Sequence, residues 1–231
     1  MKIGMIGAMD VEIAHILSQM ESKTETKKAD MTFCEGIIGK TETVVVRSGV
    51  GKVNAALCAQ MLIDCFGITH LINSGIAGSL NNDINIGDLV VSTDAVEHDM
   101  DATVFGYAKG EVPGMGVKSY EADAQLRKTI VETIKVTAPE ISVFEGRIAT
   151  GDQFISSKET KNAIRDTFHA MCCEMEGAAI AHAAYLNQIP FVVMRYISDK
   201  ADESAEVSYP EFEAAAAKHS AELIVSVIRN M

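Results

Sequence analysis

Phe191-Val192-Val193-Met194-Arg195-Tyr196-Ile197 is the most apolar strand-like stretch of the chain, and it decides the fold class. A near-continuous apolar run of this length is typical of a strand buried on both faces of a sheet. Polar residues follow at once, beginning with Ser198 and Asp199. Strands of this kind lie in sheets covered by helices, so we expect helical segments on either side of this one along the chain.

The same alternation of strand-like and helix-like segments extends outward over the whole chain. Strands are expected at residues 2–7, 33–38, 43–48, 70–73, 88–93, 144–150, 171–175 and 191–197, with 33–38 and 43–48 forming a hairpin. Helices are expected at residues 11–20, 52–66, 122–136, 158–168, 177–186 and 209–229. The alternation predicts an α/β fold with a largely parallel sheet. No repeat or linker divides the sequence, so we expect one domain over residues 1–231.

The composition limits the classes of partner. The 231 residues include 20 Lys and Arg against 32 Asp and Glu, which gives a net charge of −12 and a pI near 4.9. A protein this acidic repels phosphate backbones and anionic lipid headgroups. No apolar run has the length of a membrane span. We therefore expect neither a nucleic acid nor a membrane as a partner.

The cysteines indicate a reducing compartment. Their number, five, is odd, and no Cys-x-x-Cys occurs, so neither a disulfide framework nor a zinc ribbon is expected. The adjacent pair Cys172 and Cys173 lies in an apolar stretch, which is typical of buried, reduced thiols. The start, Met1-Lys2-Ile3-Gly4, leads directly into a strand and lacks a cleavable signal pattern. We expect a cytoplasmic protein.

Three short motifs do not support a cofactor or a metal. Gly4-x-x-Gly7 lacks the remainder of a dinucleotide fingerprint, and Gly51-Lys52 lacks the hydroxyl residue and the earlier glycine of a P-loop. His98-Asp99-Met100-Asp101 offers metal-ligating side chains, but one loop rarely supplies a full ligand set, so loop hydrogen bonds are the better interpretation. We expect no nicotinamide, no ATP and no metal.

Three carboxylates follow expected strands. Glu12, Glu176 and Asp199 each come shortly after a strand, where ligands bind in open α/β sheets. Any one of them taken alone is best interpreted as a helix cap or a turn residue. Three of them at one edge of a sheet favour a site, because carboxylates with different pKa values can divide acid and base work. The long polar loop expected at residues 97–118 is a second candidate functional segment.

An ordered series of motifs carries a resemblance to a known family. The motifs are Gly4-Met5-Ile6-Gly7-Ala8-Met9-x-x-Glu12, Ser48-Gly49-Val50-Gly51-Lys52-Val53-Asn54-Ala55-Ala56, Gly87-Asp88-Leu89-Val90-Val91-Ser92, Gly151-Asp152-x-Phe154-Ile155, Glu174-Met175-Glu176-Gly177-Ala178-Ala179 and Ile197-Ser198-Asp199. The series resembles the bacterial 5'-methylthioadenosine/S-adenosylhomocysteine nucleosidases, within the purine nucleoside phosphorylase superfamily. The likeness covers the chain from its first residue to the final helix.

The resemblance implies a fold and a reaction. The implied fold is a three-layer α/β/α sandwich with a mixed, barrel-like central sheet. The implied reaction is hydrolysis of the N-glycosidic bond of an adenine thionucleoside, which releases adenine and a thioribose without a cofactor. The implied assembly is a homodimer, in which the loop 97–118 of one subunit completes the other subunit's site.

The first turn favours hydrolysis over phosphorolysis. Phosphorylases of the superfamily hold phosphate with arginines and a glycine in that turn, whereas this chain has Met9 and Glu12 there. Arg47 is the only arginine before the long loop, and it lies within an expected strand. An anion site is difficult to build without fixed cations or a nest of backbone amides.

The resemblance also assigns roles. Asp199 matches the general acid that protonates adenine N7, and Glu12 matches the base that activates the attacking water. Binding and supporting roles fall on the ribose contacts Met175 and Glu176, the adenine contacts Phe154, Ile155 and Ser198, and the supporting residues Arg195 and Glu174. The 5'-thioalkyl pocket falls on Met9, Val50 and Tyr209, with Phe105 and Pro113 from the partner's loop.

Four positions depart from the family pattern: Val50, Ile76, Ala102 and Tyr209. Three of these, all except Ile76, border the 5' pocket, so the preference between methylthioadenosine and S-adenosylhomocysteine stays open. Two other readings also stay open. One is a relative on the same fold, either a phosphorylase or a nucleosidase for another adenine nucleoside such as 6-amino-6-deoxyfutalosine. The other is a purine-binding module without catalysis.

Overall fold

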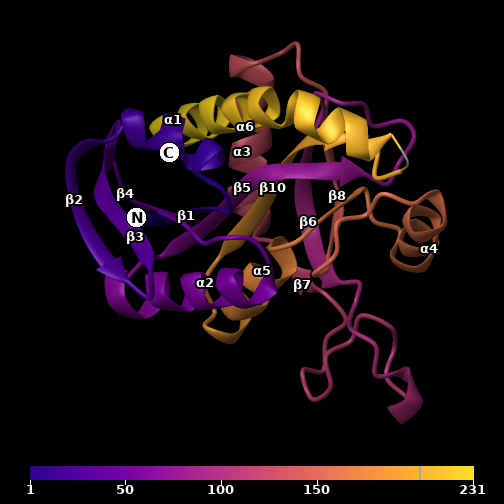
Figure 1. Ribbon diagram of the computed structural model, residues 1–231. Helices are drawn as coiled ribbons and strands as arrows, with labels where there is room; N and C mark the ends of the chain where they lie inside the picture. The colour runs from indigo at the N-terminus through magenta and orange to yellow at the C-terminus, as the bar shows by residue number, and fades with distance from the viewer. Residues whose placement is uncertain (203) are drawn as a thin grey trace.

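The computed structural model describes residues 1–202 and 204–231. At its centre, five strands close into a ring in the order β10-β6-β8-β9-β5, and β5 pairs back onto β10. The bounds are β5 His70–Ser79, β6 Leu89–Glu97, β8 Val143–Thr150, β9 Cys172–Glu174 and β10 Phe191–Asp199. Figure 1 shows how β10, β5, β6 and β8 cross within the ring. The sheet is therefore barrel-like, as the resemblance implied.

The remaining strands extend this ring into a wing. From β5 the sheet continues in the order β1-β4-β3-β2, and β7 pairs with β6. The bounds are β1 Lys2–Gly7, β2 Glu21–Lys28, β3 Met31–Ile38, β4 Thr41–Arg47 and β7 Tyr120–Glu121. The expected hairpin is present as β3 and β4, with Gly39 at φ +64° in its turn. Half of the pairings among the described strands are antiparallel, so the expectation of a largely parallel sheet is wrong.

Helices cover the sheet on both faces. Their bounds are α1 Asp10–Ser18, α2 Lys52–Phe66, α3 Ala124–Thr137, α4 Lys158–Phe168, α5 Gly177–Leu186 and α6 Ala205–Arg229. The first, third and sixth helices lie on one face, and α2 and α5 lie on the other, as Figure 1 shows. This arrangement confirms the three-layer α/β/α sandwich. Within the described ranges, no helix has both the length and the apolar character needed to cross a membrane.

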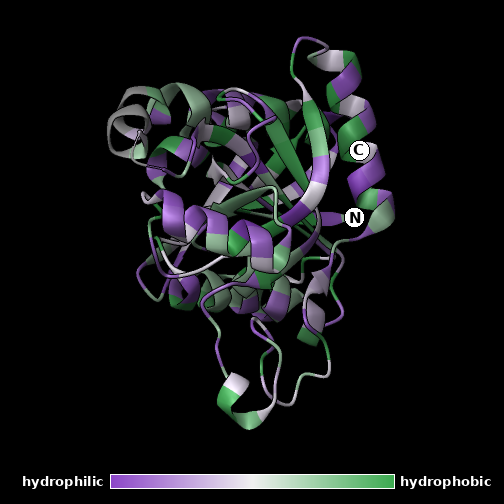
Figure 2. Cartoon of the chain, turned by 90° about the vertical axis from the view of Figure 1, so that its right-hand side faces the viewer, coloured by the Kyte–Doolittle hydropathy of each residue, from purple (hydrophilic) through white to green (hydrophobic). Residues whose placement is uncertain are grey.

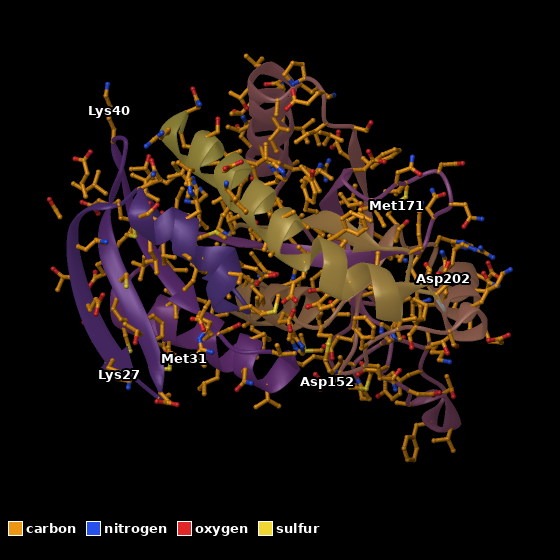
Figure 3. All side chains as sticks on the ribbon, turned by 45° about the horizontal axis from the view of Figure 1, so that its top comes forward. Lys27, Met31, Lys40, Asp152, Met171 and Asp202 are labelled. Carbon is orange, nitrogen blue, oxygen red and sulfur yellow. The ribbon has the colours of Figure 1, made fainter. Side chains whose placement is uncertain are left out.

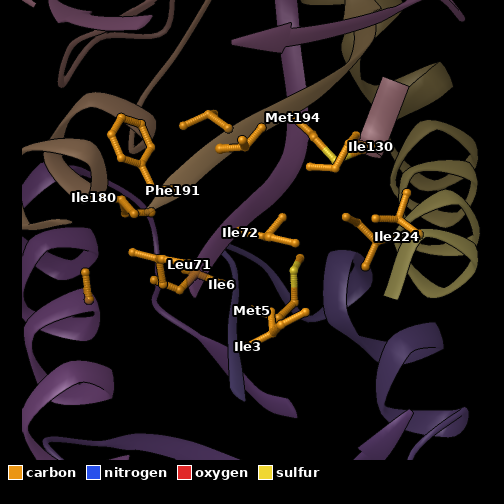
Figure 4. Close-up of a cluster of buried hydrophobic side chains, with 14 of the residues drawn as sticks. Ile3, Met5, Ile6, Leu71, Ile72, Ile130, Ile180, Phe191, Met194 and Ile224 are labelled. Atoms are coloured by element: carbon orange, nitrogen blue, oxygen red, sulfur yellow. The ribbon is translucent and has the colours of Figure 1, made fainter. Parts of the chain in front are cut away.

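The core lies between the sheet and its two helical layers. Ile72 and Met194 on the central strands are fully buried, and so are Ile180 of α5 on one side and Ile224 of α6 on the other. Figure 4 shows these side chains converging, and Figure 2 shows that the inner strands are mostly hydrophobic. Burying one such side chain contributes roughly 1.5–3 kcal/mol. Burial of the apolar segments predicted from the sequence therefore stabilises the strands and helices that carry the site.

Several elements differ from the expected ones, including β6, which ends at Glu97 rather than at residue 93, and the short strand β7, which was not expected. β2, an edge strand of exposed charged and polar residues, was not expected because its sequence has no apolar face. β5 continues to Ser79, six residues beyond the expected end at residue 73, because β10 and β9 satisfy its backbone groups although its side chains are small. α6 begins at Ala205, four residues before the expected start at residue 209.

The long loop after β6 projects away from the body of the protein. It occupies residues 98–119 and carries a short 3₁₀ helix at Thr103–Phe105 near its tip, as Figures 1 and 2 show. Its base is anchored to α2, where the Lys52 ammonium group binds the Asp99 carboxylate at 2.7 Å. The side chain of Phe105 is 80% exposed. A projecting loop with an exposed aromatic residue is typical of a segment that contacts a partner.

Candidate active site

One cavity collects the ends of the central strands. It lies beyond the carboxyl ends of β1, β5, β9 and β10, and its empty space, with the solvent at its mouth included, is about 470 Å³. Its lining residues are Ala8, Met9, Glu12, Val50, Ile76, Ala77, Gly78, Phe154, Cys173, Glu174, Met175, Glu176, Ser198, Asp199 and Tyr209. The lining combines apolar surface with four carboxylates, and this composition suits an apolar ligand with a few polar groups.

Glu12 lies in the first turn of α1, and its carboxylate turns back towards the end of β1. Oε2 accepts hydrogen bonds from the backbone N–H groups of Ala8 at 2.6 Å and Met9 at 3.1 Å, and Oε1 accepts one from Ile76 at 3.2 Å. Burial raises the pKa of this carboxyl group, while the Arg195 charge and the three amides oppose that rise. The group is thus held rigidly in a setting where it can take up a proton.

A buried ion pair joins β9 to β10. The guanidinium group of Arg195 binds Oε2 of Glu174, and the Thr150 hydroxyl donates to Oε1 of the same carboxylate. Oε2 also accepts hydrogen bonds from the N–H groups of Glu176 at 3.0 Å and Gly177 at 2.7 Å, at the start of α5. Leaving either charge alone in this interior would be costly. The pair therefore fixes the segment that presents Glu176 to the cavity.

Glu176 precedes α5, and its carboxyl group is buried in the cavity wall. Burial, followed by the nearby charge of Glu174, raises its pKa to about 7. Its Oε1 accepts a hydrogen bond from the N–H of Gly51 at 2.9 Å, which links the start of α2 to the start of α5. A carboxylate in this position can accept hydrogen bonds from ligand hydroxyl groups.

Asp199 ends β10 and is almost fully buried. Ser198 Oγ donates to its Oδ2 at 2.9 Å, and the N–H of Ala201 donates to its Oδ1 at 2.7 Å. Burial raises the pKa of the carboxyl group, and these two hydrogen bonds oppose the rise. A raised pKa is what a carboxyl group needs if it is to donate a proton near neutral pH.

The structure brings most of the predicted site residues together. Ten of them line the cavity: Met9, Glu12, Val50, Phe154, Glu174, Met175, Glu176, Ser198, Asp199 and Tyr209. Arg195 lies behind this wall and reaches it through Glu174. The ring of Phe154 meets that of Tyr209 edge to face, with centroids 5.3 Å apart, so α6 and the segment after β8 meet over the cavity.

Three predicted residues lie away from the cavity. Ile155 is buried in a small apolar cluster with Ile164 and Phe168 of α4. Phe105 and Pro113 are exposed on the projecting loop, outside the cavity of their own chain. A contribution from the backbone of Ile155, or from a partner's loop, stays a prediction.

Several residues of the site were not predicted to belong to it. Gly75 and Gly78 leave room for Glu12 and Asp199, because a Cβ atom would lie 2.6 Å and 2.7 Å from the respective carboxylate oxygens. Thr150 supports Glu174, and the buried thiol of Cys173 lines the cavity. The glycines stand in a small-residue stretch that could have signalled close approach. Thr150 carries no such signal.

The loop carboxylates bind groups of the protein itself. Asp99 binds Lys52 of α2 and accepts a hydrogen bond from the N–H of Asp152, and Asp101 accepts hydrogen bonds from Thr103 within the loop. Among the described residues, no group of three histidine, cysteine or acidic side chains is placed to hold a metal ion. All five cysteines are free.

Comparison with known proteins shows the family to which the chain belongs. Residues 2–229 match the family model described as "Phosphorylase superfamily". A 5'-methylthioadenosine/S-adenosylhomocysteine nucleosidase from an Exiguobacterium species is 40% identical over 100% of this chain and 99% of its own. The chain belongs to the 5'-methylthioadenosine/S-adenosylhomocysteine nucleosidase family. The family and enzyme class expected from the motifs, a nucleosidase that hydrolyses an N-glycosidic bond, are thereby confirmed.

Solved nucleosidase structures superpose on the whole chain. The Neisseria meningitidis nucleosidase in complex with methylthio-immucillin-A has a TM-score of 0.96 and 34% identity, over 100% of this chain and 99% of that one. The futalosine hydrolase of Helicobacter pylori has a TM-score of 0.94 and 35% identity, over 100% and 98%. The nucleosidase fold thus occurs in proteins named for different nucleoside substrates.

Proposed function

We propose that this protein hydrolyses the N-glycosidic bond of 5'-methylthioadenosine and S-adenosylhomocysteine, releasing adenine and the 5-thioribose product. The observation that carries the proposal is the presence of Glu12 and Asp199 in one cavity, each with a pKa raised by burial. The nucleosidase relatives support this substrate class. The two carboxyl groups would divide acid and base work between them.

In this mechanism Asp199 is the general acid. Adenine leaves poorly as an anion, so protonation at N7 accompanies cleavage of the bond. Burial favours the protonated carboxyl group, and the Ser198 hydroxyl and Ala201 amide hold it in one orientation. As the bond breaks, the sugar acquires oxocarbenium character, as in glycoside hydrolysis generally.

Glu12 is the general base in the same mechanism. Its carboxylate takes a proton from a water molecule as that water attacks C1'. Three backbone N–H groups fix both carboxylate oxygens and, with the charge of Arg195, stabilise the ionised form against the cost of burial. A base held in this way needs little rearrangement when the reaction begins.

The remaining lining residues would bind the substrate. Glu176 would accept hydrogen bonds from the ribose hydroxyl groups, and Met175 would pack against the sugar. The Phe154 ring would stack on adenine, whose edge the Ile155 backbone would contact. The 5'-thioalkyl group would lie against the apolar surface formed by Met9, Val50 and Tyr209.

We propose that the working form is a homodimer of single-domain subunits in the cytoplasm. The loop 97–118 would place Phe105 and Pro113 over the partner's 5' pocket. Exposed apolar side chains support such an interface, since Val53 on α2 is 79% exposed and Leu186 on α5 is also exposed. A groove lined by both helices runs beside the base of the loop. Apolar surface of this kind favours association.

Water is a better co-substrate for this cavity than phosphate. Among the described residues, no lysine or arginine lines the cavity, while four carboxylates do. Phosphate would meet repulsion there without a fixed cation. This charge distribution favours the hydrolase over the phosphorylase.

The test is adenine release from both thionucleosides, in phosphate-free buffer and again with phosphate. Release without phosphate, together with free thioribose, is expected. Release that requires phosphate and yields a sugar 1-phosphate would contradict the proposal. The similarity to a futalosine hydrolase makes 6-amino-6-deoxyfutalosine a second candidate substrate, so it belongs in the same panel. Tight adenine binding without cleavage of any nucleoside would indicate a binding module.

A further inference from the structure

A lysine occupies a core position of α4. The buried face of this helix consists of Lys161, Ile164 and Phe168, at the spacing of an amphipathic helix. Only 4% of Lys161 is exposed. A lysine is rarely buried to this extent, because removing its ammonium group from water is costly unless that group is paired. Its two neighbours on the same face are apolar, so a specific polar partner must hold it.

Those partners lie in the segment that follows Asp199. Nζ of Lys161 donates to the backbone carbonyl of Lys200 at 2.6 Å and lies 3.6 Å from Oδ2 of Asp202. Asp202, labelled in Figure 3, lies where β10 leads into α6. The lysine thus connects α4 to both ends of residues 200–202, the first part of the link between β10 and α6.

This segment holds the Asp199 carboxyl group. The N–H of Ala201 donates to Oδ1 of Asp199, and Ala201 adopts the left-handed conformation at φ +50°, which an alanine rarely adopts. Ala201 is fully buried, and its side chain packs against Gly78. A Cβ atom on that glycine would lie 2.9 Å from the Cβ atom of Ala201. Such a turn persists only where the surroundings hold it. The Lys161 contact with Lys200 supplies one such restraint.

We propose that Lys161 is a positioning residue for Asp199, because its ammonium group clamps the turn from Lys200 to Asp202 and thereby fixes the carboxyl group of the general acid. The inference rests on the proposed function of Asp199. Lys161 itself does not line the cavity, so its action is through the turn. Asp202 also accepts hydrogen bonds from Ser204, so the clamp extends to the start of α6.

The clamp also sets the charge around Asp199. Among the described residues, the titratable groups that act on Asp199 or feel its charge are Lys161 from α4, Asp202 from the turn, Cys172 and Cys173 from β9, and Tyr209 from α6. Burial raises the pKa of both thiols and of the phenol, so these three groups stay neutral near pH 7. The Lys161 charge lowers the pKa of Asp199, and the Asp202 charge raises it.

Two variants test the clamp through opposite changes in charge. Lys161→Met keeps an unbranched side chain on the buried face, and Asp202→Asn keeps the size of its side chain. Because the acid must be protonated, activity is lost as the pH rises through the pKa of Asp199. We expect the basic limb of the kcat/KM profile to move to higher pH in Lys161→Met and to lower pH in Asp202→Asn, each by about half a pH unit or more.

The split between kcat and KM provides a second measurement. We expect Lys161→Met to lower kcat about tenfold with little change in KM, since misplacing a catalytic group affects the chemical step. The matched control is Lys128→Met, the same change on the exposed face of α3, with wild-type kinetics expected. Thermal unfolding of each variant confirms that it is folded under the assay conditions.

Two outcomes would overturn the positioning role. One is a folded Lys161→Met enzyme with wild-type kcat and an unmoved basic limb. The other is a movement of the limb in the same direction in both variants, which would indicate a general structural effect. If the wild-type enzyme cleaves neither thionucleoside, the proposed function itself fails, and this result is distinct from both.

Discussion

Gly75 lies against Glu12 so closely that a Cβ atom on the glycine would be 2.6 Å from Oε1 of the carboxylate. The next residue, Ile76, donates its N–H to the same oxygen at 3.2 Å. The backbone of β5 therefore forms one wall of the Glu12 site. The φ angle of Gly75 is one that any residue can adopt. A glycine is needed here because a side chain would occupy the space of the Glu12 carboxylate.

We expect Gly75→Ala to impair catalysis more than folding. The new methyl group would push the Glu12 carboxylate from its three amide donors, and kcat would fall at least about tenfold because the base is misplaced. The measurement is kcat for adenine release together with the unfolding midpoint. Gly4→Ala is the control: there the methyl group meets the side-chain ends of Ile68, Leu71 and Leu62, so stability should fall while kcat is retained. Unchanged kcat in Gly75→Ala would contradict the assigned role of Glu12.

The sequence predicted the fold where apolar periodicity reflects burial. β10 and the helices were found because each must bury an apolar face. β2 was missed because an edge strand paired on one side needs no apolar residues. The end of β5 was missed because its small residues are held by pairing with β9 and β10, and this long-range pairing leaves no local pattern. Ring closure likewise depends on contacts between distant strands.

The candidate site was predictable in its carboxylates and less so in its supports. Glu12 and Glu176 lie within five residues of the ends of β1 and β9, Asp199 is the last residue of β10, and the topology brings these strand ends together. The Thr150 hydroxyl reaches Glu174 across two neighbouring strands, and nothing near Thr150 in the sequence signals that contact. The role of Lys161 is hidden for the same reason, since its partners lie about forty residues away.

Asp199→Asn should separate binding from chemistry. Asparagine keeps the size of the side chain and its contacts with Ser198 and Ala201, but it cannot donate the proton to adenine N7. We expect kcat to fall about 100- to 10,000-fold, the range for loss of a general acid, with adenine binding retained. Stopped assays and calorimetric titration with adenine measure the two quantities. The exposed Asp166→Asn serves as control, and an Asp199→Asn enzyme near the wild-type rate would exclude the mechanism.

Glu12 and Asp199 should give a bell-shaped dependence of kcat/KM on pH. The base must be ionised, so activity falls at low pH as Glu12 takes up a proton. The acid must be protonated, so activity falls at high pH as Asp199 loses its proton. Burial raises both pKa values, so both limbs should lie above the usual carboxyl range. Glu12→Gln should abolish turnover; retained hydrolysis in that variant would remove Glu12 as the base.

Glu176→Gln should stabilise the protein at high pH while weakening substrate binding. The pKa of Glu176 rises from 4.5 to about 7 on folding, so its contribution to stability is present below pH 4.5 and is lost as the pH rises through about 7. At 1.36 kcal/mol per pKa unit, removing the charge should add up to about 3 kcal/mol to the free energy of unfolding at pH 8. Denaturant unfolding of the wild type and the variant at pH 5 and pH 8 measures this difference in the free energy of unfolding.

The control for this effect is Glu132→Gln, which changes an exposed glutamate on α3. In this variant the change in the free energy of unfolding between pH 5 and pH 8 should equal that of the wild type. Kinetics should show that Glu176→Gln raises KM, because glutamine accepts the Gly51 hydrogen bond but lacks the charge that attracts ribose hydroxyl groups. A variant with wild-type KM, or with no gain in stability at high pH, would contradict the assignment of Glu176.

Phe105→Ser should reveal whether the projecting loop serves a partner's site. Phe105 is 80% exposed in the single chain, yet the proposed dimer buries it over the other subunit's 5' pocket. We expect the change to raise KM for methylthioadenosine about tenfold, consistent with loss of a buried aromatic contact, and to weaken dimers in sedimentation experiments. Val136→Ser on α3 is the control, since Val136 is also 80% exposed but lies outside the loop. A monomeric wild-type enzyme with full activity would show that the loop is not required.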